Sequence, residues 1–428
     1  MRHPRHPRNP RPHLYPKYAA RSNRIREMQD RRESWIFILT LGSAASVLLS
    51  IAGAETLLAI ACLAWLIVRP RPIEWPGYAI PLCAFMLATV LSLVMSPQPE
   101  VGMGAVRKFV LFSMGLLVTN FVNGPSRARV SHVALLAVAA VTSVVALGQF
   151  ALAYIKFLST QNLADDPTVL ARITGFMGHW MTFSGEQLLV WCAAVPAMVI
   201  LGRRWSIPLA VIGAALVLSF TRSAWLGGFA GLLAVAFMIP RRVLIGVIVP
   251  LAIVSVVASG LIYHRIAMSF GEKFAPDTGR LEMLFAGFRM IQDHPLFGVG
   301  PERIHTEFPH YYRGTNLHDF YYGHLHNNVV QIAAERGLPC LATFIWFILA
   351  VYADLMSMLK TAPKDTRWTI LSAIAALSGF VVAGFFEYNF GDSEVLLLLL
   401  FIVSVPYGLH SVPSEVGERS RAQATYAS

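Results

Sequence analysis

Twelve apolar stretches run through the chain, and their length constrains the fold more than any other feature of the sequence. Most approach the roughly 20 residues that a helix needs to cross about 30 Å of hydrocarbon, and the shorter ones are read as tilted or partial spans. Charged residues make up only 14% of the chain, against about 25% in soluble domains. Because lipid offers no water to unpaired backbone groups, such spans are helical. The sequence predicts an all-α polytopic membrane protein with about twelve transmembrane helices, centred near Leu39, Leu63, Phe85, Met114, Val141, Cys192, Ile212, Leu232, Ile253, Phe347, Ala376 and Leu399.

Lys and Arg residues are distributed unevenly between the connections, and this sets the orientation. With the N-terminus inside, each cytoplasmic connection is basic, whereas the opposite connections at Gly53 and Asn389 carry no Lys or Arg. The basic groups are Arg69/Arg71, Arg127/Arg129, Arg203/Arg204, Arg241/Arg242 and Lys360/Lys364/Arg367. We therefore expect both termini in the cytoplasm and residues 264 to 326 in the periplasm or cell exterior, where no nucleotide is available.

The chain divides into five regions. Residues 1 to 33 hold ten Lys or Arg with repeated prolines, which predicts a disordered cytoplasmic tail; beside a membrane helix, such a run favours an anchor near anionic lipid over nucleic-acid binding. Transmembrane helices 1 to 9 occupy residues 34 to 263 and helices 10 to 12 residues 338 to 410. A periplasmic loop takes up residues 264 to 337, and residues 411 to 428 form a second cytoplasmic tail. The four cysteines lie in apolar segments without metal-ligand spacing, as packing residues do.

The long polar insertion holds seven of the thirteen histidines and predicts two short helices of its own. The first runs from Arg280 to Asp293, with Thr278 as its N-cap and His294-Pro295 as its stop. The second lies between His326 and Arg336, before Gly337 and Pro339 introduce the next span. The first helix has an apolar stripe formed by Leu281, Leu284, Phe285, Phe288 and Ile291. The second helix has a polar stripe formed by Asn327, Gln331 and Glu335.

Two arginines and one histidine on this side carry the chemistry that we predict. The tight turn before Arg222 fixes that side chain at the outer membrane edge, where it either snorkels or has an anionic partner. We place Arg280 in the first helical turn, where a cation opposes the helix dipole unless both face an anion such as phosphate, the alternative being a solvated arginine. A histidine such as His326 accepts a proton near neutral pH, and guanidinium groups pair with diphosphate oxygens. Together they indicate glycosyl transfer from a lipid diphosphate, although a single histidine is more often structural.

Aromatic residues interleave with polar ones ahead of the second helix. Near a membrane surface they form either an interface belt or a platform on which sugar rings stack. They are Phe308, Tyr311, Tyr312, Phe320, Tyr321 and Tyr322.

Other chemistries have less support in the sequence. Metal ligand types are present in the insertion, but without a His-Glu-x-x-His helix, and His324-Leu325-His326 alone is a weak signal. An acidic group on the last outward turn, Glu387, Asp392 and Glu394, is the alternative metal site. No glycine-rich phosphate loop and no Gly-x-Ser-x-Gly turn occur. We predict a metal-independent reaction without a cofactor.

Three patches of sequence resemble the O-antigen ligase and O-antigen polymerase superfamily of bacterial envelope glycosyltransferases, which has a GT-C-like helical fold. They are Thr221-Arg222-Ser223-Ala224-Trp225, Gly279-Arg280 with residues 293 to 300 (Asp-His-Pro-Leu-Phe-Gly-Val-Gly), and His326-Asn327-Asn328 with residues 335 to 339 (Glu-Arg-Gly-Leu-Pro). Leu284 stands where the family usually has an aromatic residue, and Cys340 where it has a small one.

The resemblance implies a ligase of the inner membrane that moves O-antigen from undecaprenyl diphosphate to a sugar of the lipid A core at the periplasmic face. It implies that Arg222 and Arg280 engage the diphosphate and that His326 activates the acceptor. From their positions in the sequence we add a second tier of substrate contacts, namely Arg289, Arg172, His324, Asn327, Tyr321 and Tyr322. An O-antigen polymerase or protein O-oligosaccharyltransferase shares the donor chemistry and is the nearest alternative. A flippase or other transporter of lipid-linked glycans is the alternative from another class, but it would place charges inside its spans.

Overall fold

The structure, a computed structural model, describes residues 15–68, 73–270, 276–313 and 323–410, without the side chains of residues 15–29, 268–270 and 276–278. Most of the described residues are helical, and the described ranges contain no β-strand, which confirms the all-α class. Every predicted span centre lies within a helix. By length and composition alone, six described helices are able to cross a membrane, or seven if a pair bent by 66° counts as one span. The count of about twelve stays a prediction.

The helices follow one another with short connections. Those on which the predicted spans fall are α1 (Tyr15–Ser46), α2 (Ile51–Val68), α3 (Ala79–Val94), α5 (Ser113–Phe121), α6 (Pro125–Thr160), α7 (Trp180–Leu201), α8 (Ser206–Leu218), α9 (Arg222–Val235), α10 (Arg241–Val257), α14 (Asn328–Thr361), α15 (Arg367–Ala383) and α16 (Ser393–His410). The remaining ones are α4 (Met103–Arg107), η1 (Lys108–Phe112), η2 (Leu163–Asp165), η3 (Arg203–Trp205), α11 (Ser259–Phe270), α12 (Pro276–Asp293) and α13 (Ile304–Tyr311).

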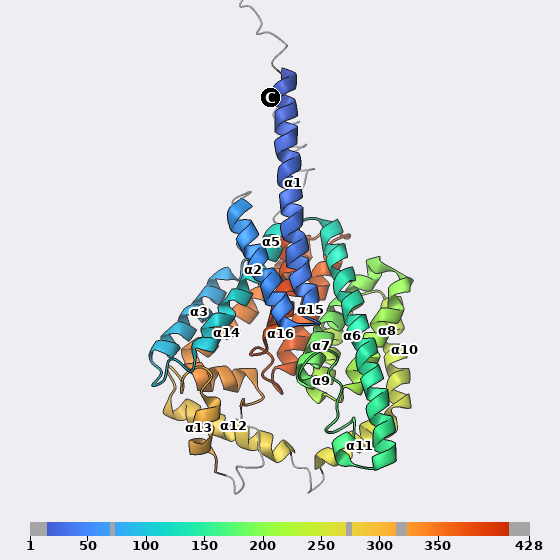
Figure 1. The fold of residues 1–428 in the computed structure, drawn as a ribbon, viewed down its shortest axis with the longest axis vertical. Coiled ribbons are helices and arrows are strands. Elements are labelled where there is room, and N and C mark those ends of the chain that lie inside the picture. Colours follow the sequence, from blue (N-terminus) through green and yellow to red (C-terminus); the bar gives the residue numbers. More distant parts are fainter. Residues whose placement is uncertain (1–14, 69–72, 271–275, 314–322, 411–428) are drawn as a thin grey trace, which may run out of the picture.

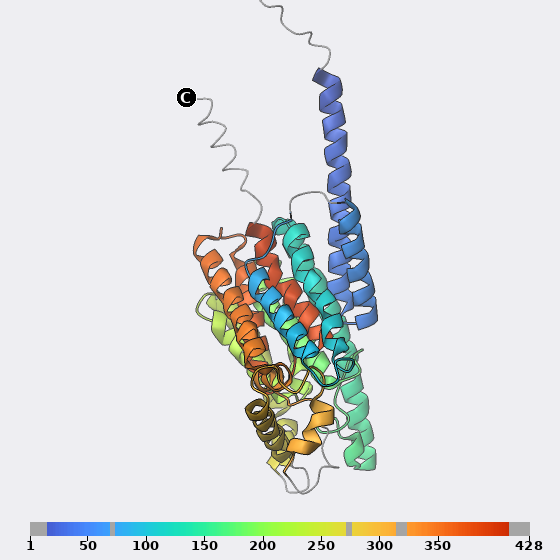
Figure 2. The same ribbon diagram turned by 90° about the vertical axis from the view of Figure 1, so that its left-hand side faces the viewer.

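The polar insertion gathers at one end of the bundle, which we call the polar end. Figure 1 shows α11, α12 and α13 there, whereas α1 begins and α16 ends toward the opposite end. Figure 2 shows the same division from the side, with α1 extending well beyond the other helices. Residues that are far apart in sequence are thus placed together at the polar end.

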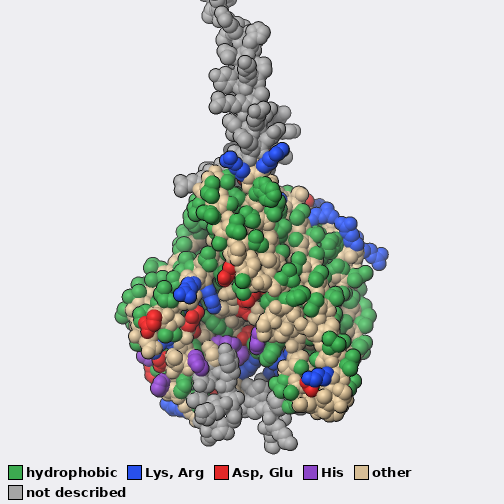
Figure 3. All heavy atoms as spheres, viewed as in Figure 1, with side chains coloured by type: hydrophobic (Ala, Val, Ile, Leu, Met, Phe, Trp, Pro, Cys, Tyr) green, Lys and Arg blue, Asp and Glu red, His purple; other side chains and the backbone are tan. Residues whose placement is uncertain are grey.

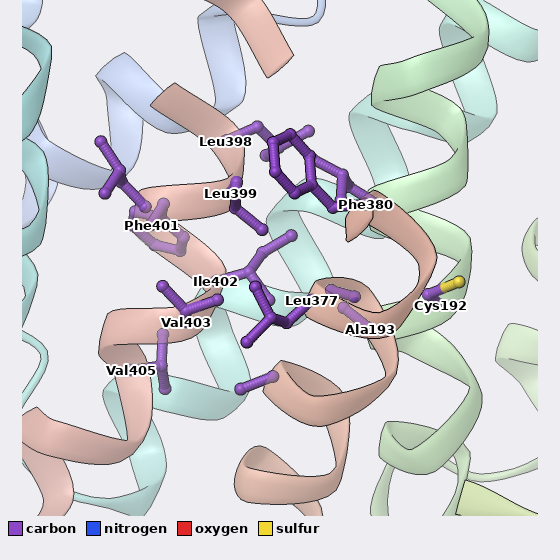
Figure 4. Packing of buried hydrophobic residues seen from close by; sticks show 14 of the residues in the cluster. Cys192, Ala193, Leu377, Phe380, Leu398, Leu399, Phe401, Ile402, Val403 and Val405 are labelled. Carbon is purple, nitrogen blue, oxygen red and sulfur yellow. The ribbon is translucent and has the colours of Figure 1, made fainter. Parts of the chain in front are cut away.

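Helix α16 forms the centre of the bundle. Its residues from Val395 to Gly408 are all buried, so other helices surround it. Figure 4 shows Leu398, Leu399 and Ile402 of this helix packed with Leu377 and Phe380 of α15. This core holds the ends of α7, α15 and α16 in fixed positions, and those ends reach the polar end.

Close contact between α9 and α15 fixes the position of Arg222. A side chain at Gly227 would lie 2.6 Å from the carbonyl oxygen of Gly379, and one at Gly231 would lie 2.6 Å from that of Ala375. Glycines spaced by four residues let helix backbones approach each other in this way. Because α15 is itself held by the core, the first residue of α9 has a defined place.

The predicted disorder of residues 1 to 33 is wrong for its later part, because α1 begins at Tyr15. Pro16 suits the first turn of a helix, where its missing N–H is not needed, and the residues after it are mostly good helix formers. Residues 1 to 14 and 411 to 428 lie outside the described residues.

Helix α12 differs from its prediction at the N-terminal end and in its buried face. It starts at Pro276, so Thr278 is not the N-cap, because a proline is well suited to open a helix. It ends at Asp293 before His294-Pro295, as predicted. Its packed face consists of Met283, Ala286 and Met290. Three members of the predicted stripe, Leu281, Phe285 and Phe288, are instead exposed, which suits a helix lying against lipid.

The start of α14 confirms the second predicted helix and its separation from the following span. Gly337 has φ +83° and ψ 167°, which breaks the helix after Arg336. Gln331 donates a hydrogen bond to Glu335 at 2.8 Å, as the polar stripe predicted. The backbone of residues 295 to 300 docks on this break through Val299 N to Ala334 O, Gly300 N to Glu335 O and Leu338 N to Pro295 O, at 2.8 to 2.9 Å. Two of the three sequence patches therefore pack on each other.

Candidate active site

Four arginines from separate parts of the chain lie close enough at the polar end for their charges to interact. We call them the arginine cluster, which consists of Arg172, Arg222, Arg265 and Arg280. Burial has the largest effect on the pKa of Arg172, and neighbouring charges add to it, so that the pKa falls to about 9. Those charges, in order of effect, belong to Arg265, Arg280 and Arg222. A guanidinium keeps its proton at neutral pH, so the repulsion remains as unfavourable energy. A bound anion would relieve it.

Arg222 is the first residue of α9 and is half-buried. The turn before it is as short as predicted, since α8 ends at Leu218. Phe220 in this turn is fully buried with φ +51°, and the hydroxyls of Ser184 and Thr221 lie 2.9 Å apart, which ties the turn to α7. A cation at the positive end of a helix dipole is favourable only with an anion between them.

Arg280 lies in the second turn of α12, not in the first as predicted, because the helix starts earlier. Its Nη1 donates a hydrogen bond to the carbonyl oxygen of Phe386 at 3.3 Å. The dipole effect falls off within the first turn, so the dipole argument applies to Arg222 and does not apply to Arg280. What places Arg280 in the site is its contact with the turn between α15 and α16.

His326 stands two residues before α14 and faces a carboxylate from the far end of the chain. Its Nδ1 lies 3.2 Å from each oxygen of Glu387, and its side chain is only 14% exposed. The ring of His324 stacks edge-on at 4.1 Å between centroids. Figure 3 shows histidine and acidic side chains around a hollow between the part that holds α12 and α13 and the part that holds α11.

The pKa shifts in this group follow from burial and from the neighbouring charges. Burial, followed by the charge of His326, lowers the pKa of His324 to about 4, so that His324 is neutral at pH 7. Burial is also the main cause that lowers the pKa of His179. For Glu387, burial alone would raise the pKa, but the hydrogen bond from His326 and nearby positive charges outweigh it and lower the pKa. Glu387 is therefore ionised at neutral pH.

Within the described residues, one group has ligand atoms close enough to hold a metal ion, namely His324, His326 and Glu387, within 4.8 Å of one another. Of the acidic group considered from the sequence, only Glu387 belongs to it. Asp392 accepts a hydrogen bond from Thr182 at 2.6 Å. Two imidazoles and a carboxylate are suitable zinc ligands. However, the nearby arginines repel a divalent cation, so the surroundings suit an anion better.

The second-tier residues fall into different places. Arg172 lies in the cluster, with its guanidinium 4.1 Å from the ring of Trp180. The hydrogen bond of Arg289 is made outside the arginine cluster. Its Nη1 donates to the carbonyl oxygen of Tyr311 at 2.8 Å and so links α12 to α13. Asn327 caps α14, as its side chain accepts a hydrogen bond from Val330 N at 3.0 Å. Tyr321 and Tyr322 lie outside the described residues.

Three residues in or beside the arginine cluster were not among the predicted site residues, namely Glu387, His179 and Arg265. Glu387 was considered only as part of a metal site, and His179 and Arg265 were not singled out at all. Arg265 is buried in α11, next to His264, which contacts Asp166 at 2.9 Å. The position of Arg265 near the end of an apolar segment is a signal from which it could have been predicted as a site residue. For His179 and Glu387, the sequence offers no signal beyond the residue type.

The fold and the cluster together define a class, a polytopic all-α membrane protein with arginine and histidine side chains gathered at one end of its bundle. A family model described as O-antigen ligase matches residues 207–345, roughly a third of the chain, from α8 into α14. This match takes in Arg222, Arg280 and His326 and confirms the resemblance seen in the sequence. Among curated proteins, no match to the chain is found.

The family supports O-antigen ligase or polymerase-type activity in general, within O-antigen and lipopolysaccharide biosynthesis. It implies lipid-linked polysaccharide and lipid A core as substrates in general terms.

Proposed function

We propose that this protein is an inverting, metal-independent glycosyltransferase that transfers O-antigen from undecaprenyl diphosphate to the lipid A core. The reaction takes place at the periplasmic face of the inner membrane. The observation that carries the proposal is the gathering of Arg172, Arg222, Arg265 and Arg280 from four elements beside His326.

The arginines bind and stabilise the donor diphosphate. Arg222 and Arg280 pair with its oxygens, and Arg172 and Arg265 add positive charge nearby. When the bond between the anomeric carbon and the diphosphate oxygen breaks, negative charge grows on the departing undecaprenyl diphosphate. Fixed guanidinium groups stabilise that charge without reorganising. The bound diphosphate also reduces the repulsion between the arginines.

His326 acts as the general base on the acceptor. It takes the proton of a core sugar hydroxyl while that oxygen attacks the anomeric carbon from the face opposite the diphosphate, so the configuration inverts. One carbon–oxygen bond forms, one breaks, and the proton passes from His326 to solvent. A positioned base contributes about 10² to 10⁴ in rate. No nucleotide or metal ion takes part in these steps.

The acceptor distinguishes a ligase from a polymerase or a protein O-oligosaccharyltransferase. The modest length of the polar insertion, residues 264 to 326, favours the ligase because an additional acceptor-binding domain does not fit in it. A transporter is less consistent with the gathering of charge at one end of the bundle.

The test is a reconstituted assay with the purified protein, lipid-linked glycan and lipid A core, without nucleotide and with EDTA. We expect a joined glycolipid from the wild type. The variants Arg222→Ala, Arg280→Ala and His326→Ala should each lose roughly 10²-fold or more of the rate, as losses of a charge-stabilising group or a base do.

Arg242→Ala is the matched control, because Arg242 is an exposed arginine at the start of α10 and has no place in the proposed site. It should keep wild-type activity. A second lipid-linked glycan in place of lipid A core tests the polymerase, and a peptide acceptor tests the protein transferase. Full activity of His326→Ala would remove the base assignment, and absence of any joined product with all three acceptors would refute the transferase.

A further inference from the structure

The turn between α15 and α16, residues 384 to 392, is held against the start of α14 by one buried asparagine. Asn328 donates its backbone N–H to Gly384 O at 2.7 Å and its side-chain amide to Asn389 Oδ1 at 2.6 Å. Its side-chain oxygen accepts from Phe390 N at 3.1 Å. The backbone N–H, the side-chain amide and the side-chain oxygen of Asn328 each form a hydrogen bond with this turn. These bonds fix the turn relative to the residues just before α14.

The neighbouring asparagine strengthens this attachment. Asn327 donates its side-chain amide to the carbonyl oxygen of Phe385 at 2.9 Å, while its oxygen caps α14. Arg280 reaches the same turn through the carbonyl of Phe386. The turn therefore touches both the histidine segment and the helix that carries an arginine of the cluster.

His326 has a backbone conformation that requires support. Its φ is +51°, in the left-handed region that residues other than glycine seldom adopt. Such conformations persist where the surrounding structure holds them, and they cluster at active sites. Here the fixed elements on both sides are Asn327 at the head of α14 and Glu387 on the clamped turn.

We infer that Glu387 is a positioning residue that holds the ring of His326 in one tautomer and one orientation, an inference that rests on the proposed function. An ionised carboxylate only accepts hydrogen bonds, so the Nδ1 of His326 must be the donor. In a neutral ring the proton is then on Nδ1, and Nε2 carries the lone pair. The nitrogen that takes the acceptor's proton is thus set by a residue 61 positions away in sequence.

The ionisation and burial of Glu387 support this role. Its hydrogen bond from His326 and the neighbouring positive charges favour the carboxylate form and lower its pKa despite burial. The turn that carries Glu387 is fixed by Asn328 independently of His326. Glu387 can therefore orient the imidazole without itself touching the substrate.

The decisive variant is Glu387→Gln, compared in the reconstituted assay with Glu387→Asp and with Glu100→Gln, an exposed glutamate on another outward loop. Glutamine keeps the size of the side chain but offers an N–H as readily as an oxygen, so the tautomer is no longer imposed. We expect kcat to fall by about 10- to 100-fold, the loss typical when the hydrogen-bond partner of a metal-ligating histidine is removed, with the KM for the lipid-linked donor changed less than threefold. Glu387→Asp keeps the carboxylate and should recover part of kcat, and Glu100→Gln should match the wild type.

Wild-type kcat in Glu387→Gln, or a loss confined to the donor KM, would overturn the inference. If Glu387→Gln shows no cooperative thermal transition, Glu387→Asp decides alone, because a lower kcat at unchanged donor KM supports positioning and an unchanged kcat contradicts it. The two proposals fail separately. If the wild type makes no joined product, the proposed function falls, whereas an active wild type, an inactive His326→Ala and a fully active Glu387→Gln would reject only the positioning role.

Discussion

At the scale of single residues, the arginine cluster is the feature that most needs an explanation. Burying Arg172 among three other arginines costs free energy, and Trp180 and the carbonyl of Val169 compensate for only part of its lost hydration. Positive charges that repel one another become favourable when a multivalent anion binds between them. We therefore propose that the cluster binds an anion, whatever glycan is attached to it.

This argument predicts how a diphosphate affects thermal stability. Inorganic pyrophosphate should raise the Tm of the purified protein, by the equivalent of about 2.7 kcal/mol at a hundred times its Kd. Arg172→Gln should raise the Tm without pyrophosphate, because it relieves repulsion, and should reduce the shift that pyrophosphate causes. Differential scanning fluorimetry measures both, with chloride at equal ionic strength as the control. An equal shift from chloride, or an undiminished shift in Arg172→Gln, would contradict the anion site.

Glu387 gives a second prediction at this scale, in the dependence of stability on pH. Its pKa is lowered in the folded protein relative to the ordinary value of 4.5, so its contribution is fully present above pH 4.5 and is lost as pH falls through the folded pKa. Glu387→Gln should therefore lower the Tm at pH 7. The difference from the wild type should shrink as pH falls below 4.5. A Tm difference that grows on acidification would show that Glu387 does not form the pair described.

At the scale of elements, the break in α14 joins two of the sequence patches. Gly337 turns the chain between the short helix and the span, and a side chain there would overlap the backbone of Leu296. Glu335 accepts hydrogen bonds from Gln331 and from the backbone of Glu302, at 2.8 and 3.1 Å. This joint holds the start of α14, which His326 precedes by two residues.

Gly337→Ala should therefore destabilise the protein. A positive φ costs a residue with a Cβ roughly 1–2 kcal/mol, and the overlap with Leu296 adds to this, so we expect a Tm lower by several degrees and reduced ligation. Gly148→Ala is the control, because Gly148 lies in α6 with open space around its Cα. Thermal unfolding and the reconstituted assay check both. Equal Tm values for the two variants would mean that the joint contributes little.

The sequence predicted these elements better than it predicted their contacts. The end of α12 at His294-Pro295 and the break at Gly337 depend on proline and glycine, whose effects are local, and both were predictable. The buried face of α12 was not, because Leu281 and Phe285 satisfy a helical stripe as well as Met283 and Ala286 do. Which face packs is decided by α14 and α13, elements that the periodicity of α12 does not report.

The site shows the same limit. Arg222, Arg280 and His326 were predicted from residue type, position near a membrane edge and resemblance. Glu387 was not assigned its contact with His326, because the two are brought together only by the packing of α14, α15 and α16. Contacts over that sequence separation leave no periodic signal in a single sequence.

At the scale of the whole molecule, the polar end and the end where α16 stops are separated by the length of the bundle (Figures 1 and 2). The distribution of Lys and Arg predicts that the polar end faces the periplasm. That orientation follows from charge in the connections and is independent of the chemistry assigned to the site. It can be tested by itself.

Single cysteines introduced into a variant without the four native ones test the orientation. Glu100→Cys, in the loop before α4, should react with a membrane-impermeant maleimide in spheroplasts. Lys364→Cys, between α14 and α15, should react only after the membrane is opened. Both positions are exposed, so access to the reagent depends on the side of the membrane. The reverse pattern would place the cluster in the cytoplasm and exclude periplasmic ligation.

The most direct test of the central claim is the ligation assay with wild-type protein and His326→Ala in the presence of EDTA. The account predicts a joined O-antigen and lipid A core glycolipid from the wild type, with the chelator present, and roughly 10² to 10⁴ less product from His326→Ala. A strict requirement for added divalent metal, or an equally active His326→Ala, would contradict it.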